Sequence, residues 1–418
     1  MEVKKLELKN FRGFGHFEIS FQSGMNLLIG VNGSGKTALL EALSIGLSAF
    51  FLGIRSQKTR SIAKNDIRVL PVGKNGTLNT EPQIPVEISI LCEWNGQDLD
   101  WKRYRETTFG KTKNDAKLLQ AITGKLDDEV RNGEEIILPL LCYYGNGRLW
   151  LEPNKTPNLN KKIFSRFDGY SLCLDPRKSL SDIEEWFRRQ EHSFFKEGTE
   201  PRHYSIVKKT ILEALPGFSD IGYDPKVNQI YIIKDDGTEL PYSGLSDGQR
   251  GILALAGDLA IRIVTLNPRA GDDVLSATPG IVLIDELDLY LHPKWQRIIA
   301  SVLQKLFPKI QFICTTHSPQ VIGELKAERI YSLDHRKTLN ESYGLDSNTI
   351  LEDIMDSSSR TNEINARYIR LEELIAEEKF EEANRLIEEL TTIMQSVDSS
   401  LNRLIAIMNN LKAMNSAG

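Results

Sequence analysis

Alternating apolar and polar positions dominate residues 2–30. The segments VKKLELKNF, HFEISF and MNLLIG alternate or stay apolar over lengths typical of β-strands. The next segment, TALLEALSIGL from Thr37, has apolar residues at helical spacing. Further on, VEISILCEW and LDWKRYRE flank Asn95-Gly96, a dipeptide typical of a tight hairpin turn. The N-terminal part is therefore predicted to combine antiparallel strands with one strand that leads into a helix.

Strands and helices are predicted to alternate from residue 116 onward. Residues 116–131 have a helical pattern, and 137–144 form an apolar run typical of a buried strand. A second hairpin is predicted to turn at Asp236-Gly237, and a helix follows it. Two more buried strands are predicted at Ile281–Ile284 and Ile310–Cys314. This alternation indicates an α/β fold with a parallel sheet.

Two long segments are mainly polar. Arg55–Thr80 is rich in Lys, Arg, Asn and Gly, and we expect a solvated, flexible loop there. Pro153–Leu215 is also polar, but parts of it keep helical periodicity, which predicts a helical insert.

The chain changes character from about Leu351 onward. Apolar residues such as Tyr368, Leu371 and Leu390 recur at three- and four-residue spacing among many Glu, which predicts an amphipathic hairpin, bundle or coiled coil. Its apolar stripe either packs within its own chain or serves dimerisation or partner docking, and the pattern does not distinguish these. The predicted domains are 1–150, 151–215, 216–345 and 346–418.

Composition narrows the class of protein. The chain has 418 residues, enough for two or three domains, and a net charge of -5, which does not indicate a nucleic-acid-binding surface overall. Its four cysteines are scattered without a C-x-x-C, so neither a zinc site nor a disulfide framework is expected. The N-terminus has no signal-peptide pattern and no long apolar span is present, so we expect a cytoplasmic protein that does not enter a membrane.

The segment Gly30–Thr37, GVNGSGKT, is a complete phosphate-loop motif between a predicted strand and a predicted helix. Its glycines allow backbone N–H groups to converge on phosphates, Lys36 supplies positive charge, and Thr37 supplies a hydroxyl for Mg²⁺. The flanking elements favour this interpretation over a glycine-rich turn that binds nothing. ATP with Mg²⁺ is the expected cofactor, and the residues assigned to the nucleotide are Asn32, Gly33, Gly35, Lys36, Thr37 and Ala38.

A second chemical motif follows the predicted strand at Ile281–Ile284. Asp285 is placed to hold Mg²⁺, and Glu286 is placed to polarise the attacking water. The alternative, in which both carboxylates only cap the next helix, is less consistent with a phosphate loop elsewhere in the chain.

The segment LSDGQR at 245–250 opens a predicted helix with an anion-binding N-terminus. Its position before the acidic pair resembles the signature motif of ABC-type ATPases. The resemblance implies that Ser246, Gly248 and Gln249 close the nucleotide site of a second subunit in a head-to-tail dimer. It also implies that Asp288 lies in the loop at the dimer interface and that His317, in CTTHSP, is a switch histidine at the γ-phosphate.

The opening KLELKNFRGFGHFEISF resembles the branch of ABC-type ATPases that holds RecF, the SMC proteins and the OLD nucleases. This resemblance implies that Arg12 reaches the nucleotide, against the alternative of a surface turn. One family element is missing, because the strand that should end near a glutamine continues instead with Tyr144, Asn146 and Arg148. Either Asn146 or Arg148 replaces this glutamine, or coupling to the insert differs.

The expected fold is thus an ABC-type ATPase head, with an antiparallel N-terminal lobe, a parallel phosphate-loop core, a helical insert and a C-terminal helical domain. Only about a hundred residues precede the signature after the Tyr144 segment, too few for the long coiled coils of SMC and zinc-hook ATPases, and no second acidic cluster indicates an OLD nuclease. YYGNGRLW and IDELDLYLHPKWQ resemble the compact bacterial ATPases of Septu and retron anti-phage systems. That resemblance implies a homodimer or higher oligomer that scaffolds a separate HNH nuclease and restrains it at high ATP.

Two other functions remain open at this stage. A RecF-like repair ATPase would bind double-stranded DNA through the basic residues in 55–68 and 177–189. A switch that binds ATP with negligible turnover is less consistent with Glu286, since an acceptor beside the Mg²⁺ aspartate is what activation of water requires.

Overall fold

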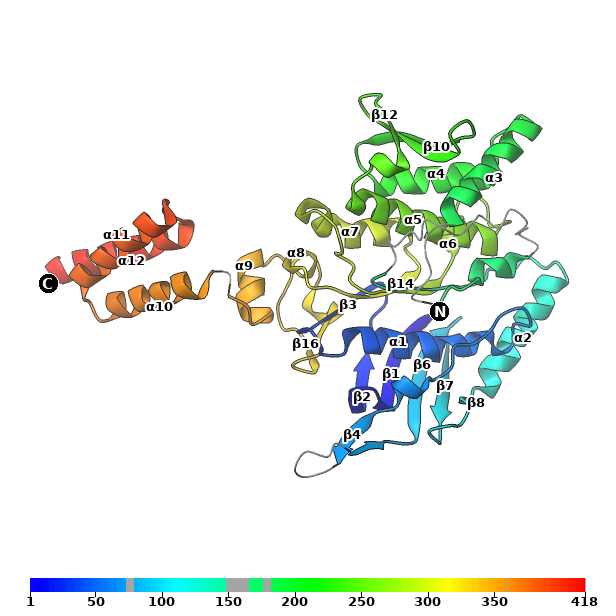
Figure 1. Ribbon diagram of the computed structural model, residues 1–418, viewed down its shortest axis with the longest axis horizontal. Coiled ribbons are helices and arrows are strands. Elements are labelled where there is room, and N and C mark those ends of the chain that lie inside the picture. Colours follow the sequence, from blue (N-terminus) through cyan, green and yellow to red (C-terminus); the bar gives the residue numbers. More distant parts are fainter. Residues whose placement is uncertain (73–78, 148–164, 176–181, 359, 418) are drawn as a thin grey trace. The chain divides into compact units, whose positions relative to one another are not determined.

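The structure, a computed structural model, describes residues 1–72, 79–147, 165–175, 182–358 and 360–417. The chain forms two compact units, Met1–Leu345 and Asp346–Gly418 (Figure 1). The larger unit carries both sheets that the sequence predicts.

A five-stranded antiparallel sheet of order β2-β1-β6-β7-β8 forms one layer of the larger unit. The predicted hairpin at Asn95-Gly96 is confirmed, because these residues join β6 to β7 with Trp94 opposite Gln97. Buried and half-exposed residues alternate along β6, so one face of this sheet packs inward. The strands are β1 (Glu2–Phe11), β2 (Phe14–Ser20), β6 (Val86–Trp94), β7 (Gln97–Arg105) and β8 (Lys113–Asp115).

A six-stranded sheet of order β16-β15-β3-β14-β13-β9 forms the second layer, parallel except for the β15–β16 pair. Every residue of β3, β14, β13 and β9 is buried, as expected for parallel strands covered on both faces. The strands are β3 (Met25–Ile29), β9 (Leu140–Tyr144), β13 (Gly280–Ile284), β14 (Ile310–Thr315), β15 (Ile330–Ser332) and β16 (Lys337–Thr338).

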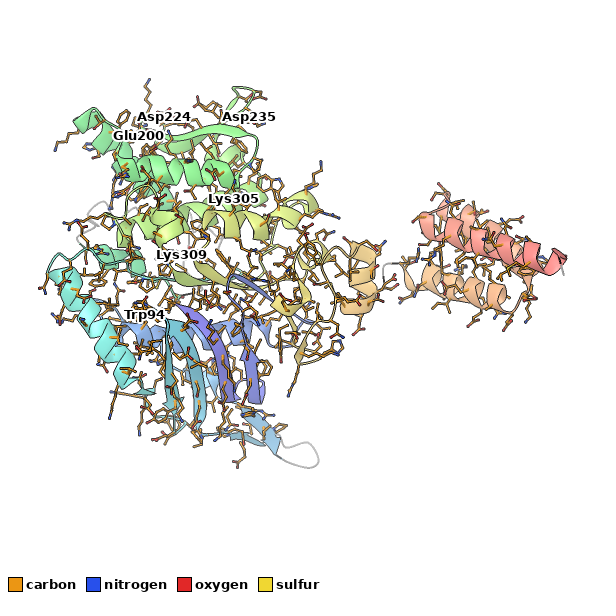
Figure 2. All side chains as sticks on the ribbon, turned by 180° about the vertical axis from the view of Figure 1, so that it is seen from behind. Trp94, Glu200, Asp224, Asp235, Lys305 and Lys309 are labelled. Atoms are coloured by element: carbon orange, nitrogen blue, oxygen red, sulfur yellow. The ribbon has the colours of Figure 1, made fainter. Side chains whose placement is uncertain are left out.

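Helix α1 (Lys36–Leu47) lies between the two sheets (Figure 1). It contacts β1, β6 and β7 on one side and β13 and β14 on the other. A helix covered on both sides must be apolar around most of its circumference, which explains the LLEALSIGL sequence. Beyond its C-terminus, Phe50 packs against Trp94, with ring centroids 5.6 Å apart. Trp94 is the last residue of β6 (Figure 2).

Helix α5 (Asp247–Leu266) contacts β9 and packs against the outer helices. A small antiparallel sheet of β10 (Phe218–Asp224), β11 (Gln229–Lys234) and β12 (Glu239–Pro241) lies against α3 and α4, and the predicted turn at Asp236-Gly237 joins β11 to β12. The remaining helices of this unit are α2 (Lys117–Arg131), α3 (Asp182–Glu197), α4 (Arg202–Ala214), α6 (Val274–Ala277), α7 (Pro293–Leu306) and α8 (Pro319–Ile322).

The basic segment Arg55–Thr80 differs from the expected solvated loop where the structure describes it. Ile62 and Ile67 are buried, and β4 (Val69–Val72) pairs with β5 (Asn79–Pro82). The buried Arg103 and Arg105 of β7 donate hydrogen bonds to backbone carbonyls of this segment, at Arg60 and Ile62. These contacts from a strand far along the chain dock the segment, and its own composition did not reveal them.

The C-terminal unit contains α9 (Ser347–Thr349), α10 (Asn362–Ala376), α11 (Phe380–Met394) and α12 (Ser399–Ala417). The predicted apolar stripes meet in a core of their own that includes Tyr368, Leu371, Leu390, Leu401 and Met408. The stripe therefore packs at least in part within its own chain. Dimerisation or docking through this unit remains a prediction.

Candidate nucleotide site at the carboxyl ends of the parallel strands

The phosphate loop follows β3 and leads directly into α1. Gly35 has a φ of 100°, and a Cβ built on it would lie 2.6 Å from Cζ of Phe14. A side chain at this position would meet both backbone strain and the Phe14 ring, so glycine is required for the loop to close here. Asn32 and Gly33 lie exposed at the tip of the loop, and Ala38 lies in the first turn of α1.

The Lys36 side chain bends back over the loop and donates hydrogen bonds to the carbonyl oxygens of Gly30 (2.7 Å) and Val31 (3.0 Å). Burial lowers the pKa of its ammonium, and the nearby charges of Asp334 and Asp285 oppose this effect. Within the described residues, the buried Ser34 hydroxyl has no hydrogen-bond partner. A cation and an unpartnered hydroxyl in a loop with converging N–H groups fit a phosphate chain.

The predicted metal ligands are brought together although they come from opposite ends of the larger unit. The Thr37 hydroxyl donates to Oδ2 of Asp285 at 2.9 Å, and Asp285 is only 2% exposed. A hydroxyl and a carboxylate side by side form an oxygen ligand set that Mg²⁺ accepts together with waters and nucleotide phosphates. The donor set therefore fits the Mg²⁺ ion of MgATP. When bound, this ion would neutralise the negative charge that develops on the phosphates.

Thr315, at the end of β14, is a site residue that the sequence interpretation did not assign. Its hydroxyl donates to Oδ1 of Asp285 at 2.6 Å and accepts the backbone N–H of Glu286 at 2.7 Å. Glu286 has a φ of 53°, a strained value of the kind that concentrates at functional sites. Thr315 thus holds the metal aspartate and the backbone of the candidate base together. The sequence indicates this residue only through the segment CTTHSP at 314–319, in which the prediction used His317 and not Thr315.

His317 follows β14 on a loop that Asp288 organises. Oδ1 of Asp288 accepts the Thr316 hydroxyl at 2.5 Å and the His317 backbone N–H at 3.3 Å. The predicted interface loop and the predicted switch-histidine loop are therefore linked within one chain. The role of His317 at the γ-phosphate remains a prediction.

The signature segment forms the first turn of α5. Ser246 caps the helix, accepting the Gln249 N–H at 3.3 Å, while the Gln249 side chain accepts the Ser246 N–H at 3.0 Å. A Cβ on Gly248 would lie 2.6 Å from the carbonyl oxygen of Tyr290, so the loop after the acidic pair packs directly on this helix turn. The side-chain hydrogen bonds of Ser246 and Gln249 are with each other, and the Ser246 carbonyl accepts the Arg250 N–H at 2.9 Å within the same helix turn.

Arg12 lies in the turn between β1 and β2 with a φ of 47°. Its guanidinium is bonded to Asp66, at 2.9 Å from Nε, and to Glu41 on α1. Burial disfavours the charge, but the Asp66 hydrogen bond and the Glu41 charge outweigh it and raise the pKa of Arg12. In this conformation both partners are carboxylates, and they are bonded through Nε and Nη2 of Arg12. Its predicted role is neither confirmed nor contradicted.

The strand that lacks the expected glutamine is β9, which ends at Tyr144 beside Ile284 of β13. Asn146 follows in a turn, and Arg148 lies outside the described residues. The carbonyl oxygen of Tyr144 accepts the backbone N–H of Asp285 at 2.8 Å. The strand end is therefore hydrogen-bonded to the metal aspartate through its backbone.

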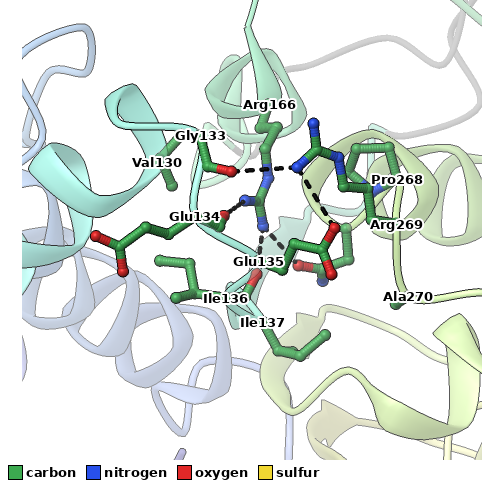
Figure 3. Close-up of a pocket in the computed structure, with 11 residues that line it drawn as sticks. Val130, Gly133, Glu134, Glu135, Ile136, Ile137, Arg166, Pro268, Arg269 and Ala270 are labelled. Carbon is green, nitrogen blue, oxygen red and sulfur yellow. Dashed lines mark hydrogen bonds and ion pairs between the residues drawn. The ribbon is translucent and has the colours of Figure 1, made fainter.

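A cavity of about 470 Å³ lies beside the amino-terminal end of β9, away from the carboxyl ends of the parallel strands (Figure 3). Arg166 donates to the carbonyls of Leu266 and Ile136, and Arg269 donates to that of Gly133 at 3.1 Å. These bonds fasten the loop before β9 to the end of α5. Since the phosphate loop follows the carboxyl end of a parallel strand, this cavity is separate from the nucleotide site.

None of the helices in the described part of the chain is long and apolar enough to cross a membrane.

The phosphate loop, the acidic pair, the helix-capping signature and the two-layer sheet arrangement define an ABC-type ATPase head of the RecF, SMC and OLD kind. The chain belongs to the AAA-domain family, whose model matches residues 5–213. A second model, described as an AAA domain, putative AbiEii toxin, Type IV TA system, matches residues 127–323.

Relatives with broad coverage include three named proteins. A Retron Ec83 probable ATPase from Escherichia coli is 26% identical, over 92% of this chain and 82% of the relative. A Retron Vc95 probable ATPase from Vibrio cholerae serotype O1 biovar El Tor is 26% identical, over 80% and 74%. The Septu protein PtuA from Bacillus thuringiensis is 25% identical, over 84% of both chains.

Among solved structures, the Smc head bound to the C-winged helix domain of ScpA is similar, with a TM-score of 0.50 and 17% sequence identity, and it covers 79% of this chain and 94% of the Smc head. This likeness concerns the fold, and it confirms the predicted fold class.

Proposed function

We propose that this chain is the ATPase subunit of an anti-phage defence complex, in which ATP-bound homodimers scaffold and restrain a separate HNH-type nuclease. The broad similarity to Septu PtuA and to retron ATPases supports the defence role. The observation that carries the ATP-dependent assembly is the position of the signature. Ser246 and Gln249 form a completed helix cap, in which each side chain accepts the backbone N–H of the other residue, and the proposal assigns the nucleotide contact of this turn to a second chain.

In this proposal each nucleotide site is completed by two chains. Lys36 holds the outer phosphates, Thr37 and Asp285 hold Mg²⁺, and Ser246 with Gly248 of the second copy binds the exposed side of the γ-phosphate. Glu286 accepts a proton from the attacking water, and His317 contacts the γ-phosphate.

Turnover in this proposal is slow, about 1 s⁻¹ or less, which is at the low end of enzyme rates and suits a regulatory switch.

The experiment is co-expression of this chain with the genes that flank it in its genome, followed by a test for an HNH-type nuclease in the purified complex. A stable complex is expected, with nuclease activity at least about tenfold lower in millimolar ATP than after ATP depletion, a difference of about 1.4 kcal/mol. Lys36→Ala is the control, because a complex that cannot bind ATP should lack this response. Failure of the two proteins to co-purify, or a nuclease indifferent to ATP, would contradict the proposal.

A second experiment tests the dimer. Glu286→Gln keeps the shape of the side chain but removes the proton acceptor, so it should retain ATP and accumulate the ATP-bound dimer. Glu324→Gln, on an exposed glutamate, is the matched control. Light scattering with ATP should show twice the monomer mass for Glu286→Gln. An unchanged mass together with unchanged turnover would remove Glu286 as the base.

The RecF-like alternative is less consistent with the basic residues on which it depends. Arg55 is paired with Asp127 and Asp128, and Arg188 and Arg189 both bond Glu185. Residues 177–181 lie outside the described residues. Binding of double-stranded DNA stays a secondary candidate that a salt-dependent binding assay would test.

A further inference from the structure

Two adjacent tyrosines end β9 and face opposite sides of the parallel sheet, as successive strand residues must. The Tyr144 hydroxyl donates to Oδ2 of Asp258 on α5 at 2.7 Å, and this hydrogen bond is fully buried. The Tyr143 hydroxyl is buried and, within the described residues, has no hydrogen-bond partner. Burial raises the pKa of Tyr143, and the charges of Asp285 and Glu41 raise it further.

Asp258 belongs to a buried network on the helix that begins with the signature. Arg262 donates to the same carboxylate oxygen of Asp258 at 2.7 Å and to the carbonyl of Gly169 at 2.7 Å. Asp258 and Arg262 are 5% and 4% exposed. A buried ion pair with its hydrogen bonds satisfied holds one geometry, because any displacement leaves a charge without compensation. The network therefore transmits a shift in Tyr144 to α5 instead of absorbing it.

The same residue is attached to the metal site through its backbone, since the carbonyl of Tyr144 accepts the Asp285 N–H at 2.8 Å. One residue thus bonds the metal aspartate with its main chain and the signature helix with its side chain. Asp258 lies twelve positions after Ser246, about 18 Å along a helix at 1.5 Å per residue. Between these points α5 is a continuous helix, which moves as a rigid element.

We propose that Tyr144 is the positioning residue that couples nucleotide occupancy at Asp285 to the placement of the signature turn on the same chain. The coupling itself lies within one chain. Only its consequence, that the two nucleotide sites of a dimer influence each other, rests on the proposed function. In this proposal Tyr144 replaces the glutamine that this strand lacks. The sequence alone suggests Asn146 or Arg148 for that role.

The experiment measures hydrogen exchange on the full chain with and without MgATP, in the wild type, Tyr144→Phe and Tyr170→Phe. Tyr170 is the matched control, because its buried hydroxyl makes a bond of similar length, 2.6 Å, to the carbonyl of Pro139 and not to α5. MgATP should slow exchange at least about threefold at residues 246–251 in the wild type and in Tyr170→Phe. In Tyr144→Phe this change should be absent, while the slowing at residues 30–38 persists.

Two results would overturn the coupling. One is an equal response at residues 246–251 in Tyr144→Phe, and the other is no response there in the wild type despite protection of residues 30–38. Light scattering on the same samples separates this inference from the proposed function. A chain that stays monomeric but keeps a Tyr144-dependent response at α5 would count against the dimer and leave the coupling standing.

Discussion

Thr37 and Asp285 are separated by 248 positions in the chain, yet the hydroxyl of one donates to the carboxylate of the other at 2.9 Å. This bond exists because β3 and β13 are parallel strands of one sheet, separated by β14, so that their carboxyl ends lie at the same edge. The strand between them contributes Thr315, which bonds the other oxygen of Asp285. Three neighbouring strands therefore bring together, at their carboxyl ends, the residues assigned to the metal side of the candidate nucleotide site.

The first prediction concerns Thr315. Thr315→Val preserves the shape of the side chain but removes both hydroxyl bonds, one to Asp285 and one from Glu286. Losing them should cost about 1–3 kcal/mol in a buried site, hence roughly a 5- to 160-fold lower kcat with a higher Mg²⁺ requirement. Thr315→Ser retains the hydroxyl and should stay close to the wild type. A wild-type kcat in Thr315→Val, or a loss in Thr315→Ser as large as that in Thr315→Val, would contradict the role given to the hydroxyl.

The second prediction concerns the contact between the signature and Tyr290. Gly248→Ala would place a Cβ 2.6 Å from the Tyr290 carbonyl oxygen and displace the loop after the acidic pair. ATP-dependent dimerisation should weaken at least about tenfold, about 1.4 kcal/mol, while binding of ATP to the monomer is retained. Analytical ultracentrifugation and equilibrium dialysis measure the two quantities.

The control for Gly248 lies four residues earlier. A Cβ on Gly244 would meet only Pro241, at 3.5 Å, which is an ordinary contact. Gly244→Ala should therefore dimerise as the wild type does. If it weakened dimerisation as much as Gly248→Ala, the effect would come from general strain around the start of α5.

The third prediction concerns the far end of the phosphate-loop helix. Arg103 is 1% exposed and donates to the carbonyl of Ile45 at 2.8 Å and to Ser48, so it binds the C-terminal end of α1. Burial lowers the pKa of its guanidinium to about 10, so Arg103 remains charged at neutral pH and complements the helix dipole. Arg103→Met leaves these acceptors buried without donors and should lower the free energy of unfolding by about 2–4 kcal/mol.

Arg55→Ala is the matched control for Arg103→Met. The Arg55 side chain is 62% exposed and pairs with the buried Asp127 at 3.3 Å, and Asp127 has a second, closer partner in Arg131 at 2.7 Å. Loss of the Arg55 side chain should change the free energy of unfolding by less than about 1 kcal/mol. Urea denaturation followed by circular dichroism measures both variants, and a smaller effect of Arg103→Met would mean that its desolvation cost cancels its hydrogen bonds.

The fourth prediction concerns thiol reactivity and pH. All four cysteines are buried, and burial raises the pKa of Cys92 to about 12 from a usual value of 9.0. At pH 8 the native chain should therefore not react with a thiol reagent within minutes, whereas all four thiols should react in urea. A fast-reacting thiol in the folded protein would contradict this burial.

The same shift predicts a pH dependence of stability. Between pH 9 and about pH 12 the unfolded chain loses the Cys92 proton while the folded chain keeps it. Folding then favours the protonated form, so the contribution of Cys92 to stability falls as pH rises through this window. Cys92→Ala should flatten that part of the curve.

Several features could be predicted from the sequence because their causes are local. The phosphate loop needs glycines and a lysine at fixed spacing, and the hairpin at Asn95-Gly96 needs two residues that tolerate a positive φ. The buried strand before Asp285 and Glu286 shows as a continuous apolar run. Each of these patterns spans fewer than about a dozen residues, within which chain geometry alone links residue type to conformation.

Other features depended on residues far apart in the chain. The short strand β15 was not predicted, since three residues carry little periodicity until β3 offers them a partner. The segment from Arg55 was expected to be a loop because nothing in its own composition reveals the buried arginines of β7 that hold it. The missing glutamine was sought after Tyr144, whereas the connection to α5 is made by Tyr144 itself.

The sequence by itself determined which chemistry the chain carries, because a phosphate loop and a strand ending in two carboxylates are local solutions to binding MgATP. Only the tertiary structure decided how those parts are connected. Hydrogen bonds from Thr315 to Asp285, from Arg12 to Glu41 and from Tyr144 to Asp258 depend on the order and register of the strands. Strand order is set by packing over the whole unit, and no short segment of sequence contains that information.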